Sequence, residues 1–232
     1  MLGLMSKKQL LISSLIEHSS RYHGNTEIVE RLSNGIINKI TYNDIHKRMK
    51  QLAAWLINNN IQIGDRIGTI AWSNQRHLEL YYGISGIGAI CHTINPRLFK
   101  EQLIYIINDA QDKLIFIDLD LLTIFEEISS KLTTVTTVII MCSLKEMPRG
   151  FNSDKIIYCY EEIIKSMEPI DEWPNFDERT ASSLCYTSGT TGNPKGVLYS
   201  HRSTLIHTLA AANPDALNIS SVDIIMPIAP MF

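Results

Sequence analysis

Residues 186–196 read Tyr-Thr-Ser-Gly-Thr-Thr-Gly-Asn-Pro-Lys-Gly, a segment crowded with hydroxyl groups and glycines. Threonine and serine hydroxyls donate hydrogen bonds to phosphate oxygens or offer a lone pair to a metal ion. Glycines let the backbone approach a ligand closely, and successive backbone N–H groups in such a loop form a concave site for an anion. The pattern therefore predicts a loop that binds a polyphosphate. Its hydroxyl and glycine residues are Thr187, Ser188, Gly189, Thr190, Thr191, Gly192 and Gly196.

The same segment carries a single lysine, Lys195, whose compact positive charge can follow a phosphate as it leaves. Pro194 fixes its own φ angle and biases Asn193 toward an extended backbone, so the lysine follows a stiffened stretch of chain. We expect Lys195 to stabilise the charge that develops on a departing pyrophosphate, which is an electrostatic kind of catalysis.

Other glycine-rich motifs do not fit. A Walker loop has four residues between its first glycine and a Gly-Lys-Ser/Thr triplet, whereas here Gly196 follows Lys195 in place of a serine or threonine. A nucleophile elbow needs a glycine two positions before the serine, and Tyr186 stands there. One alternative remains for the segment, a solvated Ser/Thr/Gly loop without a ligand.

A second glycine run, with the pattern G-x-x-G-x-G, has the reverse order of the dinucleotide-binding fingerprint, which favours close helix–strand packing instead of a dinucleotide site. Its glycines are Gly83, Gly86 and Gly88.

At every position, residues 186–196 resemble the phosphate-binding signature of the adenylate-forming (AMP-binding) superfamily. Residues 184–185 and 197–203, together with both ends of the chain, resemble its medium- to long-chain fatty acyl-CoA synthetase branch. The resemblance implies an ATP-dependent fatty acid–CoA ligase. In such an enzyme the fatty acid carboxylate attacks the α-phosphorus of ATP and gives an acyl-adenylate and pyrophosphate. The thiol of coenzyme A then displaces AMP. ATP, Mg²⁺ and the co-substrate coenzyme A are therefore expected.

The resemblance also assigns roles to residues. It implies that Lys195 is catalytic, that the loop holds the β- and γ-phosphates, and that Thr187 reaches Mg²⁺. We expect the loop to close on ATP and to open for release of pyrophosphate. The expected nucleotide-binding residues are Thr187, Ser188, Gly189, Thr190, Thr191, Gly192 and Lys195. The Asn-Pro-Arg-Leu run at 95–98 also resembles the family, but Arg97 is assigned no catalytic role, because a salt bridge with a neighbour would account for it.

Composition narrows the class further. With 232 residues and 45% hydrophobic content the chain can bury a substantial core, and a net charge of −3 gives no case for nucleic acid binding. No apolar run approaches the ~18 residues of a membrane span, so only peripheral membrane contact is left open, as is a homodimer. The four cysteines, which form no C-x-x-C pair, favour reduced thiols and a cytoplasmic location; they are Cys91, Cys142, Cys159 and Cys185.

Hydrophobic periodicity predicts an α/β fold with mostly parallel sheets wrapped by helices, because strand and helix patterns alternate from 41 to 141. A hairpin at 27–32 and 36–40 precedes this region, and a helix capped by Thr41 and Asp44 opens it. The family resemblance implies antiparallel strands at 183–186 and 196–199 on either side of the loop. Ser200 is expected to cap a helix whose first turn carries His201 and Arg202, and two alternatives stay open for these two residues, solvent contact and ligand binding. The inward residues of this helix are expected to be Leu205, Ile206 and Leu209, and a final strand is expected at 223–232.

The expected organisation is a truncated N-terminal AMP-binding domain over 1–232. It comprises the alternating region 41–141, a surface linker at 167–179, and the loop hairpin, helix and strand of 180–232. In the resembled family the adenine, ribose and magnesium residues and a C-terminal domain with its own lysine follow the position of Phe232. We therefore expect an incomplete acyl-adenylating domain that is inactive by itself. Two alternatives are a polyphosphate-binding module without catalysis and a non-enzymatic remnant.

Overall fold

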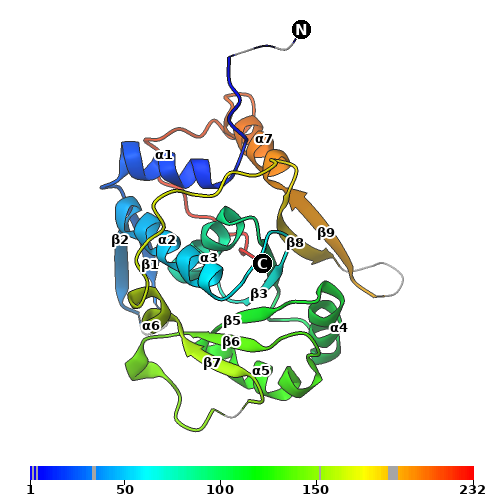
Figure 1. Ribbon diagram of the computed structural model, residues 1–232. Coiled ribbons are helices and arrows are strands. Elements are labelled where there is room, and N and C mark those ends of the chain that lie inside the picture. Colours follow the sequence, from blue (N-terminus) through cyan, green and yellow to red (C-terminus); the bar gives the residue numbers. More distant parts are fainter. Residues whose placement is uncertain (2, 4, 33–34, 152, 188–192) are drawn as a thin grey trace.

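The computed structural model describes residues 1–232 except 2, 4, 33–34, 152 and 188–192 (Figure 1). The described residues form a seven-stranded sheet in the order β7-β6-β5-β3-β4-β8-β9. Every neighbouring pair is parallel except β8 with β9, which is antiparallel. The predicted α/β fold with a mostly parallel sheet is confirmed. The strands are β3 (Arg66–Ile70), β4 (Ile90–Ile94), β5 (Leu114–Asp118), β6 (Thr137–Met141), β7 (Ile156–Cys159), β8 (Ala181–Thr187) and β9 (Lys195–Ser200).

Helices cover both faces of the sheet. One apolar cluster joins α2 (Tyr42–Asn58), α3 (Gln75–Gly86) and α6 (Tyr160–Lys165) to one face. A second cluster joins α4 (Lys100–Ala110) and α5 (Leu122–Ile128) to the other. Strands buried on both faces need apolar residues at successive positions, which explains why the sequence shows short continuous apolar runs there.

Helix α2 begins where the sequence predicts. The side chain of Thr41 accepts a hydrogen bond from the backbone N–H of Asp44 at 3.2 Å, and its hydroxyl donates to the Asp44 carboxylate at 2.6 Å. This satisfies one of the N–H groups that the first turn of a helix leaves without a partner. The buried face of the helix consists of Ile45, Met49, Leu52, Ala53, Trp55 and Leu56.

A separate antiparallel ribbon consists of β1 (Glu27–Arg31) and β2 (Ile37–Thr41), as predicted. Its half-buried Ile28 and Ile40 pack against the cluster of α1 (Ser13–His23) and α2. Among the described residues, no helix is long and apolar enough to cross a membrane.

The glycine run at 83–88 serves close packing, although the partners are not strands. A Cβ at Gly83 would lie 2.6 Å from Cδ2 of Leu52 in α2, and a Cβ at Gly86 would collide with the ring of Trp173. Trp173 belongs to the predicted surface linker, residues 167–179. The linker is therefore a strap against α2 and α3, and the Trp173 indole N–H donates to Nε2 of His46 at 3.3 Å.

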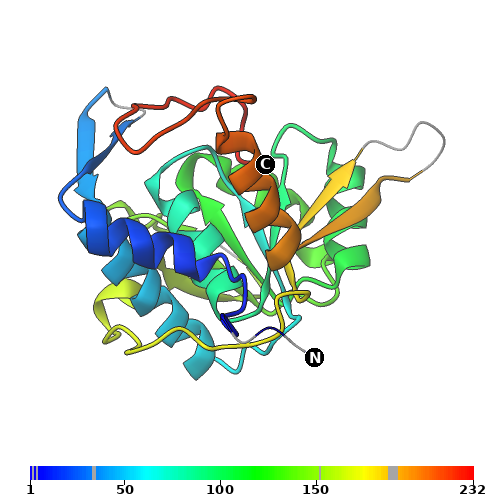
Figure 2. The same ribbon diagram turned by 90° about the horizontal axis from the view of Figure 1, so that it is seen from above.

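Two expectations for the last part of the chain are wrong. Residues 223–232 form no strand and run as irregular coil, drawn in red in Figure 2. In α7 (His201–Ala212) Leu205 is buried, but Ile206 and Leu209 are 43% and 58% exposed. The physical reason is the same in both cases. No described segment covers Ile206 and Leu209 of α7, and no described strand pairs with residues 223–232, so the apolar pattern has no partner in the described part of the chain.

Candidate active site

The β8–β9 hairpin carries the hydroxyl-rich segment. Strand β8 is hydrogen-bonded in parallel to β4, so the first arm of the hairpin belongs to the main sheet. Strand β9 pairs with β8 and ends the sheet as its edge strand in the described part of the chain. Of the sequence-predicted site residues, the structure describes Thr187, Lys195 and Gly196, whereas Ser188, Gly189, Thr190, Thr191 and Gly192 lie outside the described residues.

Thr187 and Lys195 are paired directly across the hairpin, at the point where both strands end. Directly paired residues in an antiparallel ladder have Cβ atoms about 4.5–5.5 Å apart on one face. Both residues are exposed, and within the described residues neither side chain has a hydrogen-bond or ion-pair partner. The hairpin thus brings a free hydroxyl and a free ammonium group together at the entrance of the loop.

The same edge of the sheet carries a cleft. Because β8 is parallel to β4, Thr187 lies at the edge formed by the carboxyl ends of the parallel strands. There, between β3 and β5, chain connections depart in opposite directions, which is where open α/β sheets bind ligands. A cavity of about 740 Å³ lies at this position, and its lining includes Trp72, Asn74, Asp118 and Cys142.

Several of the charged groups that line this cleft have hydrogen-bond or ion-pair partners. Asp118 accepts from the backbone N–H of Trp72 at 2.8 Å and from the Asn74 amide at 3.0 Å. Burial nevertheless raises the pKa of Asp118 to about 6. The guanidinium of Arg48 donates to Glu79 at 2.7 Å and to Glu161 at 3.0 Å. The Arg48 contacts join α2, α3 and α6 beside the cleft.

Arg97 at the end of β4 has no carboxylate partner among the described residues, so the salt-bridge interpretation is wrong. Its guanidinium carbon lies 5.6 Å from the ring centre of Trp72 and 6.0 Å from that of Phe232. These are cation–π contacts. Sequence alone gave no sign of them, because the three residues are far apart along the chain.

The opposite end of the hairpin is fixed to the start of the chain. Ser200 caps α7, as predicted, by accepting from the backbone N–H of Ser203 at 3.1 Å. His201 is buried rather than solvated, and its Nδ1 accepts from the backbone N–H of Ile12 at 3.2 Å. Burial lowers the pKa of His201 to about 4, so the ring is neutral at pH 7. The alternative of solvent contact is wrong for His201.

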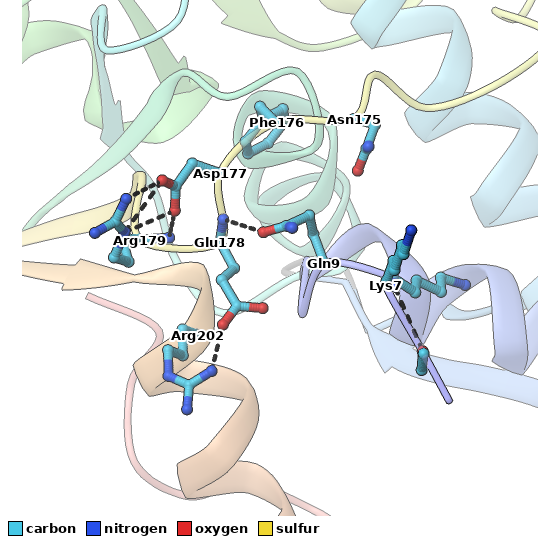
Figure 3. Close-up of a pocket in the computed structure, with 10 residues that line it drawn as sticks. Lys7, Gln9, Asn175, Phe176, Asp177, Glu178, Arg179 and Arg202 are labelled. Atoms are coloured by element: carbon cyan, nitrogen blue, oxygen red, sulfur yellow. Dashed lines mark hydrogen bonds and ion pairs between the residues drawn. The ribbon is translucent and has the colours of Figure 1, made fainter. Parts of the chain in front are cut away.

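Glu178, in the segment 167–179, contacts both the start of the chain and helix α7. Its carboxylate accepts from the backbone N–H of Leu10 at 2.8 Å and pairs with Arg202, as the close-up in Figure 3 shows for Arg202. A cavity of about 740 Å³ between Lys7, Asn175 and Arg202 opens beside these contacts. It lies at the base of the hairpin, away from Thr187 and Lys195, and carries charges of both signs.

All four cysteines are free. Cys185 lies two positions before Thr187, and its sulfur is 3.2 Å from Oγ1 of Thr93. Cys91 on the neighbouring strand is fully buried, and this burial raises the pKa of its thiol.

Two known proteins match the whole of this chain in sequence. A 3-methylmercaptopropionyl-CoA ligase of Ruegeria lacuscaerulensis is 48% identical over 100% of this chain and 43% of its own length. A medium-chain-fatty-acid–CoA ligase of Ectopseudomonas oleovorans is 46% identical over 100% of this chain and 42% of its own. The chain therefore spans less than half the length of these relatives.

Solved structures show the same fold. A long-chain-fatty-acid-CoA ligase from Archaeoglobus fulgidus matches with a TM-score of 0.76 at 20% identity, over 95% of this chain and 42% of that one. An anthranilate CoA ligase in complex with anthranoyl-AMP matches with a TM-score of 0.77 at 20% identity, over 91% and 38%. The sequence profile described as "AMP-binding enzyme" matches residues 16–232. With this match and the identities above, the chain belongs to the AMP-binding enzyme family.

Proposed function

We propose that this chain is the N-terminal, ATP-gripping part of an ATP-dependent acyl-CoA ligase. The observation that carries the proposal is the pairing of Thr187 with Lys195 at the mouth of the hydroxyl-rich loop. A cation and a hydroxyl, both exposed at the carboxyl edge of a parallel sheet, suit the triphosphate of ATP. The names of the relatives, which are CoA ligases, support this reaction class.

The residues have distinct proposed roles. The Lys195 ammonium group balances the negative charge that appears on pyrophosphate as the bond to the α-phosphorus breaks. The hydroxyls and amides of 187–192 hold the β- and γ-phosphates. Mg²⁺ commonly binds through substrate phosphates plus one or two protein oxygens, and Thr187 is proposed to supply one of them. ATP activates the carboxylate, and coenzyme A receives the acyl group.

The organisation follows from the same proposal. We assign 1–232 to the N-terminal AMP-binding domain, with the alternating region 41–141, the strap 167–179, and the hairpin, helix and coil of 180–232. The isolated chain is proposed to be inactive in adenylation, since the relatives are more than twice as long. A cytoplasmic location, peripheral membrane contact and a homodimer stay predictions.

The proposed acid is a medium- or long-chain fatty acid. The relatives carry the names of different acids, one a methylthio-substituted short acid and one a medium-chain fatty acid. A panel of acids from three to sixteen carbons, together with 3-methylmercaptopropionate, separates these possibilities. We expect the fatty acids of the panel to give the highest kcat/KM.

Exchange of labelled pyrophosphate into ATP tests the reaction. The assay uses the polypeptide continued to the length of its relatives, with the 232-residue chain beside it. We expect acid-dependent exchange by the longer polypeptide only. Tight binding of ATP with no exchange for any acid would instead support the alternative of a polyphosphate-binding module, and absence of both would support the remnant.

A further inference from the structure

Tyr186, the residue before Thr187, is held on two sides by the main sheet and its helices. Its hydroxyl donates to Oδ2 of Asp109 in α4 at 2.6 Å. Its ring centre lies 5.2 Å from that of His92 on β4. Burial, followed by the neighbouring Asp109, raises the pKa of Tyr186, so the hydroxyl keeps its proton and stays a donor at neutral pH.

His92 in turn forms a buried pair with Asp112, which lies between α4 and β5. The two atoms Nδ1 and Oδ2 are 2.7 Å apart, and both side chains are fully buried. Nε2 of His92 and Oδ1 of Asp112 have no partner in the described part of the chain. Incompletely satisfied polar groups in a core cost stability, and an apolar pair of the same size would cost less. The pair therefore calls for an explanation other than stability.

Two glycines make room for these side chains. A Cβ at Gly68 would lie 3.1 Å from Oδ2 of Asp112, and a Cβ at Gly196 would lie 3.2 Å from Cζ of Tyr186. Gly196 also pairs directly with Tyr186 across the hairpin. The last glycine of the hydroxyl-rich segment thus admits the tyrosine ring, which is a separate role from approach to phosphate.

The hairpin has little other support on this side. Strand β9 is the edge strand of the described sheet, and Val197, Leu198 and Tyr199 are 37%, 59% and 46% exposed. In Figure 1 the paired ends of β8 and β9 lie above α4. Its direction therefore depends on the contacts of β8 with β4 and α4, and the side chain of Tyr186 makes the contact nearest to Thr187.

We propose that Asp109 and the His92–Asp112 pair are positioning residues for phosphate binding: they fix the Tyr186 side chain and with it the end of β8 from which Thr187 departs. The inference rests on the function proposed above. It predicts that loss of these contacts weakens ATP binding but changes neither KM for the acid nor the rate of the second half-reaction.

Two substitutions remove the outer contact with little change in side-chain size, Tyr186→Phe and Asp109→Leu, the second because leucine has no acceptor for the Tyr186 hydroxyl. In the polypeptide continued to the length of its relatives, each substitution is expected to raise KM for ATP about tenfold, the effect of losing one hydrogen bond to a charged group. KM for the acid stays unchanged, and so does thioester formation from supplied acyl-adenylate. The double variant is expected to match either single one, because both remove the same bond.

Tyr160→Phe is the matched control. The Tyr160 hydroxyl also donates to a carboxylate at 2.6 Å, that of Glu79, but it lies in the apolar cluster on the other face of the sheet. It is expected to lower stability and leave KM for ATP unchanged. For the inner pair, His92→Leu is expected to raise KM for ATP, whereas His92→Gln, which keeps an amide donor for Asp112, restores most of the binding.

Amide hydrogen exchange on the 232-residue chain gives a second readout that needs no activity. Residues 181–187 and 195–200 are expected to exchange faster in Tyr186→Phe and Asp109→Leu than in Tyr160→Phe. Unchanged exchange at these residues, or a KM for ATP that rises equally in the control, would overturn the proposal. A longer polypeptide without acid-dependent pyrophosphate exchange would count against the proposed function alone, since the hydrogen-exchange comparison still decides the positioning role.

Discussion

Thr187 and Lys195 lie opposite each other in the last rung of the β8–β9 ladder, one at the end of each strand. The ladder fixes this pairing through the backbone, so it does not depend on the conformation of the loop between them. The two groups are a hydroxyl and an ammonium, and both are exposed. The consequences for catalysis can be tested one side chain at a time.

Replacement of the ammonium group should affect the first half-reaction. Lys195→Ala is expected to slow acid-dependent pyrophosphate exchange by about 10²–10³-fold, the usual cost of one electrostatic donor at a developing charge. Thr191→Ala should act in the same direction and less strongly. Thioester formation from supplied acyl-adenylate is the internal control, and Lys165→Ala, an exposed lysine on α6, is the control variant. Equal slowing of both half-reactions would argue against the role at pyrophosphate.

Replacement of the hydroxyl should change the response to magnesium. Thr187→Val keeps the shape and the β-branched preference for a strand but removes the oxygen. We expect a higher Mg²⁺ concentration for half-maximal exchange, whereas Thr187→Ser keeps the wild-type value. Thr208→Val, which removes an exposed hydroxyl on α7, is the control. An unaltered Mg²⁺ titration in Thr187→Val would contradict the proposed role of Thr187 as a metal ligand.

His201 should make stability depend on pH. Its pKa in the folded chain is about 4, below the usual value of 6.5, so between pH 6.5 and 4 the unfolded chain binds a proton that the folded chain excludes. The free energy of unfolding should therefore fall as pH drops through this window, by roughly 1–3 kcal/mol from this residue. Urea unfolding at pH 7, 5.5 and 4.5 measures the change.

The contribution of His201 is isolated by difference, because other buried groups titrate in the same range. Burial also lowers the pKa of His77 to about 4, whereas it raises that of Asp118 to about 6, which acts in the opposite direction. His201→Gln should flatten the pH dependence relative to wild type. His207→Gln, at an exposed position of the same helix, should not. Parallel curves for wild type and His201→Gln would contradict the assignment.

Gly83 should be intolerant of a side chain because of one neighbour. Its added Cβ would lie 2.6 Å from Leu52 Cδ2, so Gly83→Ala is expected to lower the free energy of unfolding by about 1–3 kcal/mol. Leu52→Ala alone should also destabilise, but the double variant should lose less than the sum, since the smaller residue leaves room. Gly3→Ala, with nothing within 4 Å, is the control. Additive losses would mean that the two sites do not interact.

Local signals predicted most of the fold. The parallel strands appear as apolar runs because both faces are covered, and the caps at Thr41 and Ser200 are visible as residue types at fixed spacing. Strand β7 and helix α6 had no prediction. Both are short, and only Cys159 of the four strand residues is buried, so the periodic signal is weak.

Other incorrect and missing predictions concern tertiary contacts, not secondary-structure elements. The pattern of Ile206 and Leu209 identified an apolar face of α7 but not what covers it. The contacts of Tyr186 with Asp109 and His92 join segments 77 or more positions apart, which no local pattern encodes. One hint existed: Gly68 stands inside a strand, where glycine often marks a close approach, here that of Asp112.

The backbone N–H groups of Leu10 and Ile12 donate to Glu178 and His201, so this short segment ties an early part of the chain to the base of the hairpin. A truncation that removes these residues, or a bulky affinity tag fused beside them, is therefore expected to disturb the β8–β9 hairpin and with it the proposed ATP site, although the two lie far apart in the sequence. A tag placed away from these residues would leave the two hydrogen bonds of Leu10 and Ile12 intact.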